Sequence, residues 1–102
     1  QSADAKVLRQ MGDELLARLG SGVILLGSRA EDKVLFLAKA SKDVVKLGVN
    51  AGAVIKETAK VAGGGGGGRP DMAQAGGKDP GKLADALAVG KQILREQLTN
   101  HR

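Results

Sequence analysis

The chain has 102 residues, of which 16 are Lys or Arg and 11 are Asp or Glu, so its formal net charge at pH 7 is +5. A chain of this length forms one small domain, which buries about 65% of the surface that its unfolded form exposes. Aromatic residues make up 1% of the chain, Phe36 alone, so the core must be aliphatic and a base-stacking surface is disfavoured. The basic balance makes polyanions plausible partners, and a nucleic acid would be held by its backbone.

Several kinds of site lack the residues that they need. There are no cysteines, which excludes disulfides, thiolate metal ligands and cysteine nucleophiles, and a cytoplasmic location is compatible with this. His101 is the single histidine, and next to the last residue it is expected to fray rather than to act as a ligand or base. No apolar run approaches the length of about 20 residues that spans a bilayer, and no signal peptide opens the chain, so we expect a soluble protein without a membrane partner. Because the chain begins at Gln1 and enters a helical pattern at once, we expect a piece of a longer polypeptide.

The first forty residues predict a helix and a hairpin. Apolar residues recur at helical spacing from Ser2 to Leu19, with Ser2 as the N-cap and Gly20 beyond the end. Two continuous apolar runs follow, Val23–Leu26 and Lys33–Ala38, separated by a polar segment as in an antiparallel hairpin. Their continuous apolarity predicts cover on both faces.

The second half predicts two long helices. Ser41 is expected to cap a short helical turn, and Asn50 to cap a second helix. This second helix is expected to pack by one apolar face and to lead into a glycine tract. Asp79 and Pro80 form a start signal for a last helix that ends near Leu98, because aspartate caps N-termini and proline suits the first helical position. Gly90 is expected to weaken that helix by about 1 kcal/mol relative to alanine.

The fold class predicted from these elements is α+β. A small antiparallel β-sheet packs with several helices, and a Gly-rich loop joins the last two helices. Two units are expected, an N-terminal helix over residues 1–20 that ends a helical linker, and a globular module over residues 21–102.

The six consecutive glycines that begin at Gly63 carry no side chain that could build a core or perform acid–base chemistry. Composition favours a slack linker, and the alternative is a loop whose N–H groups approach a ligand closely. The glycines satisfy a dinucleotide-binding fingerprint only trivially, because a helix rather than a strand precedes them. A nucleotide triphosphatase loop would need Gly-Lys-Ser/Thr at its end, where Arg69-Pro70-Asp71 stands instead.

Anion recognition by main-chain N–H groups remains as a chemistry for this tract. Arg69 could donate to a phosphate in a fork, Lys78 could assist, and the helix N-terminus near Pro80 would add a partial positive charge. The alternative is that Arg69 pairs with Asp71 or Asp79 and only staples the loop. Residue chemistry alone does not decide between these two interpretations.

The string from Gly63 to Gly77, with Arg-Pro-Asp-Met-Ala-Gln-Ala between its two glycine runs, closely resembles the signature of the C-terminal domain of alanyl-tRNA synthetases. A similar module is attached to DHH-family phosphoesterases, where it helps to hold single-stranded nucleic acid. The resemblance covers essentially the whole chain. The family usually has a longer helical part before the globular part, which here is represented only by the helix ending at Leu19.

The resemblance implies a domain without a catalytic centre, metal or cofactor, which belongs to an alanine–tRNA ligase and binds tRNA. It implies that the domain grips the outer corner of tRNA and helps the aminoacylation and editing sites to share one molecule, with the other synthetase domains and, in some members, a homodimer as partners. The alternative function is self-association or docking between domains. Structural roles in the motif are expected for Pro70, Asp71, Gln74 and Asp79. The residues expected to contact nucleic acid are Gly63, Gly64, Gly65, Gly66, Gly67, Gly68, Arg69, Gly76, Gly77, Lys78, Lys56 and Lys60.

Overall fold

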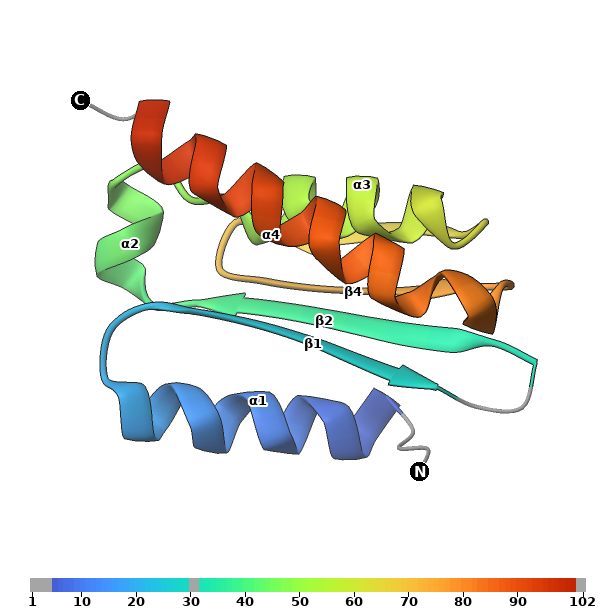
Figure 1. Cartoon of the computed structure of the whole chain (residues 1–102). Helices are drawn as coiled ribbons and strands as arrows, with labels where there is room; N and C mark the ends of the chain where they lie inside the picture. The colour runs from blue at the N-terminus through green and yellow to red at the C-terminus, as the bar shows by residue number, and fades with distance from the viewer. Residues whose placement is uncertain (1–4, 30–31, 101–102) are drawn as a thin grey trace.

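The structure is a computed structural model that describes residues 5–29 and 32–100. Four helices, one short 3-10 helix and four strands follow one another along this part of the chain (Figure 1). In chain order they are α1 (Ala5–Leu19), β1 (Val23–Arg29), β2 (Val34–Ala40), α2 (Lys42–Lys46), α3 (Ala51–Val61), β3 (Gly65–Arg69), β4 (Met72–Gly77), η1 (Pro80–Lys82) and α4 (Leu83–Asn100).

The strands form one antiparallel sheet in the order β1-β2-β4-β3. Helix α1 lies on one face, over β1 and β2, and α3 and α4 lie on the other face (Figure 1). The central strand β2 is therefore covered on both sides, as its continuous apolar run predicts, and Phe36 and Leu37 are both fully buried although they point to opposite faces. The predicted α+β class and the predicted hairpin of β1 and β2 are confirmed.

The core between the sheet and α3 is aliphatic and rich in alanine. Val34 and Phe36 of β2 pack there with Ile55 of α3, and the predicted apolar face of α3 is buried along its whole length. Small side chains let the backbones approach closely, and this explains why one phenylalanine suffices for the core. On the opposite face Leu8 anchors α1, with 2% of its surface exposed.

The predicted N-caps Asn50 and Ser41 have different outcomes. The Asn50 side chain accepts a hydrogen bond from the Ala53 N–H at 3.1 Å, as an N-cap does. The Ser41 side chain makes no capping bond. Its hydroxyl accepts from the Gly22 N–H and donates to Asp43, because the chain before α2 packs beside the start of β1. The expected N-cap Ser2 lies outside the described residues.

Gly90 has a packing role that helical periodicity did not predict. A Cβ at this position would lie 2.4 Å from Thr58 Oγ1 of α3 and 2.9 Å from Leu25 Cδ2 of β1. Glycine is therefore the residue that lets α4 approach both neighbours. Its cost in helix propensity is offset by close packing.

Candidate nucleic-acid interface

The glycine tract forms a strand at the edge of the sheet, where the sequence predicted a loop. Residues Gly65–Arg69 make β3, which pairs with β4 so that Gly66 lies opposite Ala75 and Gly68 opposite Ala73. Glycine has a low intrinsic preference for strands, so local propensity gave no sign of this pairing. Pairing with β4 and packing against α3 stabilise the strand despite that low preference.

Alternate glycines of β3 have different surroundings. Gly66 and Gly68 share the face of Ala75 and Ala73, which is the face that α3 covers. A Cβ at Gly66 would lie 2.4 Å from the Ala75 Cβ, and a Cβ at Gly68 would lie 2.7 Å from the Met72 carbonyl oxygen. At Gly64, just before the strand, it would lie 1.8 Å from the Gly76 carbonyl oxygen. These glycines are needed so that the hairpin can close.

The glycines on the other face are open. Among the described residues, a Cβ added at Gly65 or Gly67 would meet no atom within 4 Å, and every residue of β3 is exposed. Helix α1 covers β1 and β2 on this face and makes no extensive contact with β3. The outer surface of β3 is thus backbone without side chains, on which a ligand can approach N–H and C=O groups directly.

Arg69 and Lys78 do not converge. Arg69 ends β3 at the turn into β4, whereas Lys78 follows the far end of β4. A six-residue strand separates them, which corresponds to about 20 Å. The two cations therefore do not share one anion site, and the hairpin carries one basic side chain at each end.

Arg69 pairs with Asp71, which the sequence analysis gave as an alternative to phosphate binding. Its Nε lies 3.4 Å from Asp71 Oδ1, and the Arg69 side chain remains 72% exposed. An exposed pair of this kind contributes little to stability. The terminal nitrogens of the guanidinium are not part of this contact, so the pair orients the side chain and leaves a donor fork available.

The two lysines of α3, Lys56 and Lys60, differ in their surroundings. Lys60 pairs with Glu57 at 3.1 Å one turn back along the helix. Lys56 is exposed and follows by one turn the position of Gly52, whose missing Cβ would lie 2.7 Å from the Gly68 carbonyl oxygen. Because residues four apart share a helix flank, Lys56 lies on the side of α3 that borders the glycine strand.

The motif residues expected to be structural tie the hairpin to the rest of the fold. The Pro70 carbonyl accepts from the Ala51 N–H, and the Asp71 carbonyl accepts from the Ala40 N–H, both at 2.9 Å. The Asp79 side chain accepts from the Gly81 N–H at 3.0 Å and so caps η1.

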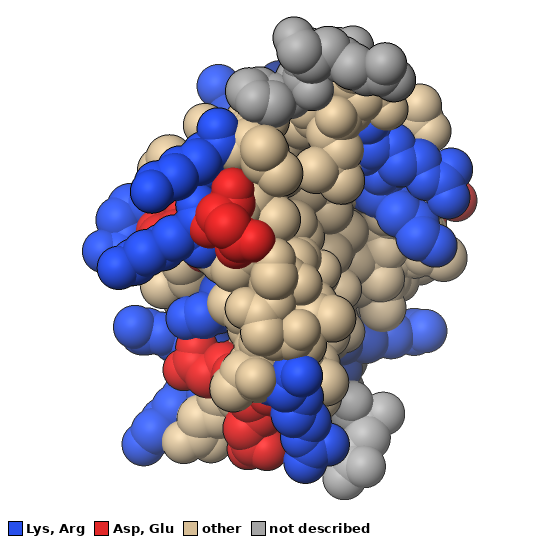
Figure 2. Space-filling model, turned by 90° about the vertical axis from the view of Figure 1, so that its left-hand side faces the viewer, with Lys and Arg blue, Asp and Glu red and all other residues tan. Residues whose placement is uncertain are grey.

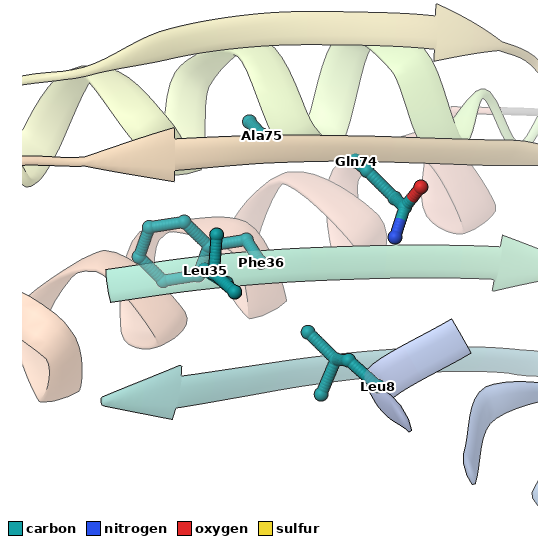
Figure 3. Close-up of a pocket in the computed structure, with 5 residues that line it drawn as sticks. All are labelled: Leu8, Leu35, Phe36, Gln74 and Ala75. Carbon is teal, nitrogen blue, oxygen red and sulfur yellow. The ribbon is translucent and has the colours of Figure 1, made fainter. Parts of the chain in front are cut away.

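Gln74 projects from β4 on the same face of the sheet as α1, which covers β1 and β2 there. Figure 3 shows its side chain beside a hollow of about 210 Å³, toward which Leu8 projects from α1. Leu35 of β2 supplies a further apolar wall. Gln74 and Ala75, which line this hollow, pair with Gly67 and Gly66, so the hollow lies on β4 beside the glycine strand.

The turn between β3 and β4 lies beside α2, none of whose residues is among those expected to contact nucleic acid. Lys42 and Lys46 line a hollow together with Arg69 and Pro70. Figure 2 views this end of the molecule, where Lys and Arg side chains project on both flanks of an uncharged band. Their spacing of four residues on a short helix was visible in the sequence, but the approach of α2 to the turn was not.

The described residues contain no group of three or more His, Cys, Asp or Glu that could hold a metal ion. Among these residues, too, no helix is both long and apolar enough to cross a membrane.

Asp43 has a pKa below its ordinary value, because the Ser21 and Ser41 hydroxyl groups donate hydrogen bonds to its carboxylate. His101 lies outside the described residues.

Comparison with known proteins identifies the class. A family model for the DHHA1 domain matches residues 1–96. The chain therefore belongs to the DHHA1 domain family. A solved DHH-domain protein, described as belonging to a family of ribosomal proteins, is 21% identical with a TM-score of 0.62 over 91% of this chain and 22% of its own, and it shows the shared fold alone.

Closer relatives narrow the class. The C-Ala domain of alanyl-tRNA synthetase from Aquifex aeolicus is 42% identical, with a TM-score of 0.81 over 90% of this chain and 82% of that domain. The alanine–tRNA ligase of Alkaliphilus oremlandii is 62% identical over 91 residues, which are 89% of this chain and 10% of that protein. The Bacillus subtilis enzyme is 58% identical over 95 residues, 93% of this chain and 11% of that protein.

Within the DHHA1 family the chain thus belongs with the C-terminal domains of alanyl-tRNA synthetases, as its motif predicted. It spans about a tenth of the length of the curated relatives that it matches. The division at residue 20 stays a prediction, although α1 packs on the same sheet as the rest of the chain.

Proposed function

We propose that this chain is a non-catalytic tRNA-binding module of an alanyl-tRNA synthetase, which helps one tRNA to be shared between the aminoacylation and editing sites. Its partners in this proposal are alanine-specific tRNA, held at the outer corner of the L, and the other synthetase domains, in the cytoplasm. The names of the relatives, which are alanine–tRNA ligases, support tRNA as the partner.

The observation that carries the proposal is the bare glycine edge of the sheet. In an edge strand every second residue directs its N–H and C=O away from the sheet, and the four glycines of β3 have no side chains of their own to shield these groups. Arg69 stands at one end of this edge, Lys78 at the other, and Lys56 borders it from α3. This spread suits a backbone that runs along the hairpin better than one isolated phosphate.

Binding by this surface is expected to be weak and salt-dependent, because few cations contribute. Titration of alanine-specific tRNA at two ionic strengths measures it. Arg69→Ala should weaken binding severalfold and reduce the dependence of log K on log salt by about 0.7 to 0.9, the contribution of one phosphate contact. Arg95→Ala on α4 is the matched control, since Arg95 is also exposed and α4 borders the opposite edge of the sheet. Equal binding by the two variants would remove Arg69 from the interface.

A second candidate function, self-association, is favoured by the other edge of the sheet. Strand β1 is apolar and has no strand partner on its outer side within the described part of the chain. Val23, Leu25, Leu87 and Leu94 line a groove of about 600 Å³ between β1 and α4. An apolar edge strand of this length is a template for pairing.

The α1 side of the same edge is apolar too. Asp13 of α1 faces β2, where it pairs with Lys39 at 2.6 Å. Met11 lies about 200° around the helix from Asp13, so it points toward the outer edge of β1. Met11 and Leu15 are 45% and 39% exposed there.

The occupant that fits this edge is a second copy of the chain. Two-fold antiparallel pairing of β1 with itself would bring Arg29, at the end of one strand, beside the start of the other, where Ser21 donates a hydrogen bond to Asp43. The cation of one copy then approaches the carboxylate of its partner at both ends.

Sedimentation velocity over a range of concentrations tests self-association. The wild type should show a concentration-dependent dimer, and Val23→Lys should abolish it, because a charge on an edge strand opposes pairing. Val89→Lys is the control, since Val89 is 37% exposed on α4 but does not line the groove. A wild type that stays monomeric, or a Val23→Lys variant that still dimerises, rejects pairing through β1.

A further inference from the structure

The hollow beside the β3–β4 turn has the properties of a small ligand pocket. Its volume is about 360 Å³, at the lower end of the range for ligand pockets. Its wall is almost entirely carbon, supplied by Val45, Pro70 and the aliphatic stems of basic side chains. The residues that line it are Lys42, Val45, Lys46, Arg69, Pro70 and Asp71.

The rim of this pocket is cationic. Lys42 and Lys46 are four residues apart, so they project from the same side of α2. Arg69 stands across from them on the turn, and Asp71 is the one carboxylate in the set. Three cations against one carboxylate leave a net charge of +2, and the contact of Asp71 with Arg69 Nε leaves the terminal guanidinium nitrogens as donors.

Both walls of the pocket are held in place by the fold. On the α2 side, the Asp43 carboxylate accepts hydrogen bonds from Ser21 and Ser41, which ties the helix to the start of β1. On the turn side, the carbonyls of Pro70 and Asp71 accept from backbone N–H groups of the segments that flank α2. The pocket is therefore preformed, which reduces the ordering cost of binding.

We propose that this pocket binds one unpaired nucleotide of an RNA loop. The base or ribose lies on the carbon wall of Val45 and Pro70, and the flanking phosphates contact Lys42, Lys46 and Arg69. The inference rests on the proposed tRNA-binding function and adds to it the structural class of RNA that this end of the interface selects.

The carbon wall and the cations together decide the ligand class. A bare phosphate gains nothing from a carbon wall, and a nucleotide in a duplex keeps its base stacked and cannot insert it. An unpaired nucleotide presents both a flat apolar group and phosphates within one pocket's width. The surface offers no aromatic platform, so contact with the base is by apolar packing rather than ring stacking.

The test uses the full chain and three probes measured by fluorescence anisotropy or competition. These are a short single-stranded oligoribonucleotide, the duplex of the same sequence, and inorganic tripolyphosphate. The double variant Lys42→Ala/Lys46→Ala should bind the single strand about fivefold to tenfold more weakly, with a salt dependence of log K lower by about 0.7 for each lost contact. The affinity of Lys42→Ala/Lys46→Ala for the duplex should change no more than that of the control variant Lys6→Ala/Lys91→Ala.

The control removes the same charge elsewhere. Lys6→Ala/Lys91→Ala takes one exposed lysine from the start of α1 and one from the groove beside β1. All four lysines are exposed, so both double variants should keep the wild-type melting temperature.

A second variant separates the carbon wall from simple charge attraction. Val45→Ser keeps the charge and should reduce the preference for single strand over duplex about threefold, without changing tripolyphosphate binding. In the wild type, the Val45 methyl resonances should show nuclear Overhauser contacts to base or ribose protons of the bound single strand.

The outcomes separate this inference from the function on which it rests. If the wild type binds neither tRNA nor the single strand, the proposed function fails together with the inference. If tRNA binds in an Arg69-dependent way but Lys42→Ala/Lys46→Ala matches the control, the inference alone is rejected. Equal losses for single strand and duplex, or displacement of the single strand by an acidic peptide at lower concentration, also overturn it.

Discussion

The two edges of the sheet differ in the way they meet solvent. At β1 the edge is built from large apolar side chains, with α1 and α4 on either face and a groove between β1 and α4. At β3 the edge is built from glycines, with α3 on one face, while on the other a Cβ added at Gly65 or Gly67 would meet no described atom within 4 Å. An apolar edge suits protein partners, and a bare backbone edge suits a polar ligand that must approach closely.

Glycine also serves close packing at both edges, but in different elements. Near β1 the glycine stands in the helix, at Gly90 of α4, whereas near β3 the glycines stand in the strand. The glycines of the tract therefore have two roles, which alternate along the strand. Gly64, Gly66 and Gly68 let the hairpin close against the fold, whereas a Cβ added at Gly63, Gly65 or Gly67 would meet open space among the described residues.

The largest expected effect separates these two sets of glycines. Gly64→Ala should destabilise the domain by about 3 kcal/mol, because its Cβ would collide with the Gly76 carbonyl oxygen and both groups are backbone that cannot turn aside. Gly65→Ala should change stability by less than about 1 kcal/mol, since its Cβ meets open space. Urea unfolding of both variants measures the difference. Similar losses for the two would show that the alternation does not govern packing.

Gly90→Ala tests the corresponding close approach near β1. We expect a net loss of about 1 to 2 kcal/mol, because the collision with Thr58 and Leu25 outweighs the gain in helix propensity. Adding Thr58→Ala removes the shortest collision and should recover part of the loss relative to Thr58→Ala alone. Thermal unfolding checks this cycle, and a stabilised Gly90→Ala single variant would contradict it.

The two edges should also be separable in function. Val23→Lys is expected to alter self-association and leave tRNA affinity within about twofold of the wild type, because β1 and β3 lie at opposite sides of the sheet. Arg69→Ala should show the reverse pattern. Sedimentation and tRNA titration on the same two proteins measure it. If either variant changes both properties equally, the edges do not act independently.

The smallest effect concerns α2, which carries the lysines of the turn pocket. The lowered pKa of Asp43 means that its ionised form is favoured in the folded state, so this stability is present above the unfolded pKa, near 3.8, and is lost as pH falls through the lower folded value. The wild type should therefore melt slightly above Asp43→Asn at neutral pH, and the two should converge in strong acid. Melting curves across that range check it, and a gap that widens toward acid would reverse the assignment.

Local sequence signals identified most of the fold. The apolar spacing of α3, the Asn50 cap and the two apolar runs of β1 and β2 correspond to elements whose stability comes from burying one stripe or one face. The motif around Arg69 identified the family. Such signals succeed because burial periodicity and capping depend on residues that are close in the chain.

The placement of the candidate site depended on contacts that are distant in the chain. Arg69 and Lys78 are close in the sequence, yet strand formation sets them at opposite ends of β4. Lys42 and Lys46 lie well before the motif, yet α2 places them beside Arg69. Neither result follows from local preference, because glycine disfavours strands and only pairing with β4 and cover by α3 stabilise one here.

From the sequence alone, the chain was determined to be a small aliphatic α+β domain of basic charge, with a glycine motif typical of one family. Only the tertiary structure decided that the six glycines divide between packing and exposure. The reason is that a run of glycines has no hydrophobic periodicity. The role of each glycine depends on whether other atoms occupy the space that a Cβ would need.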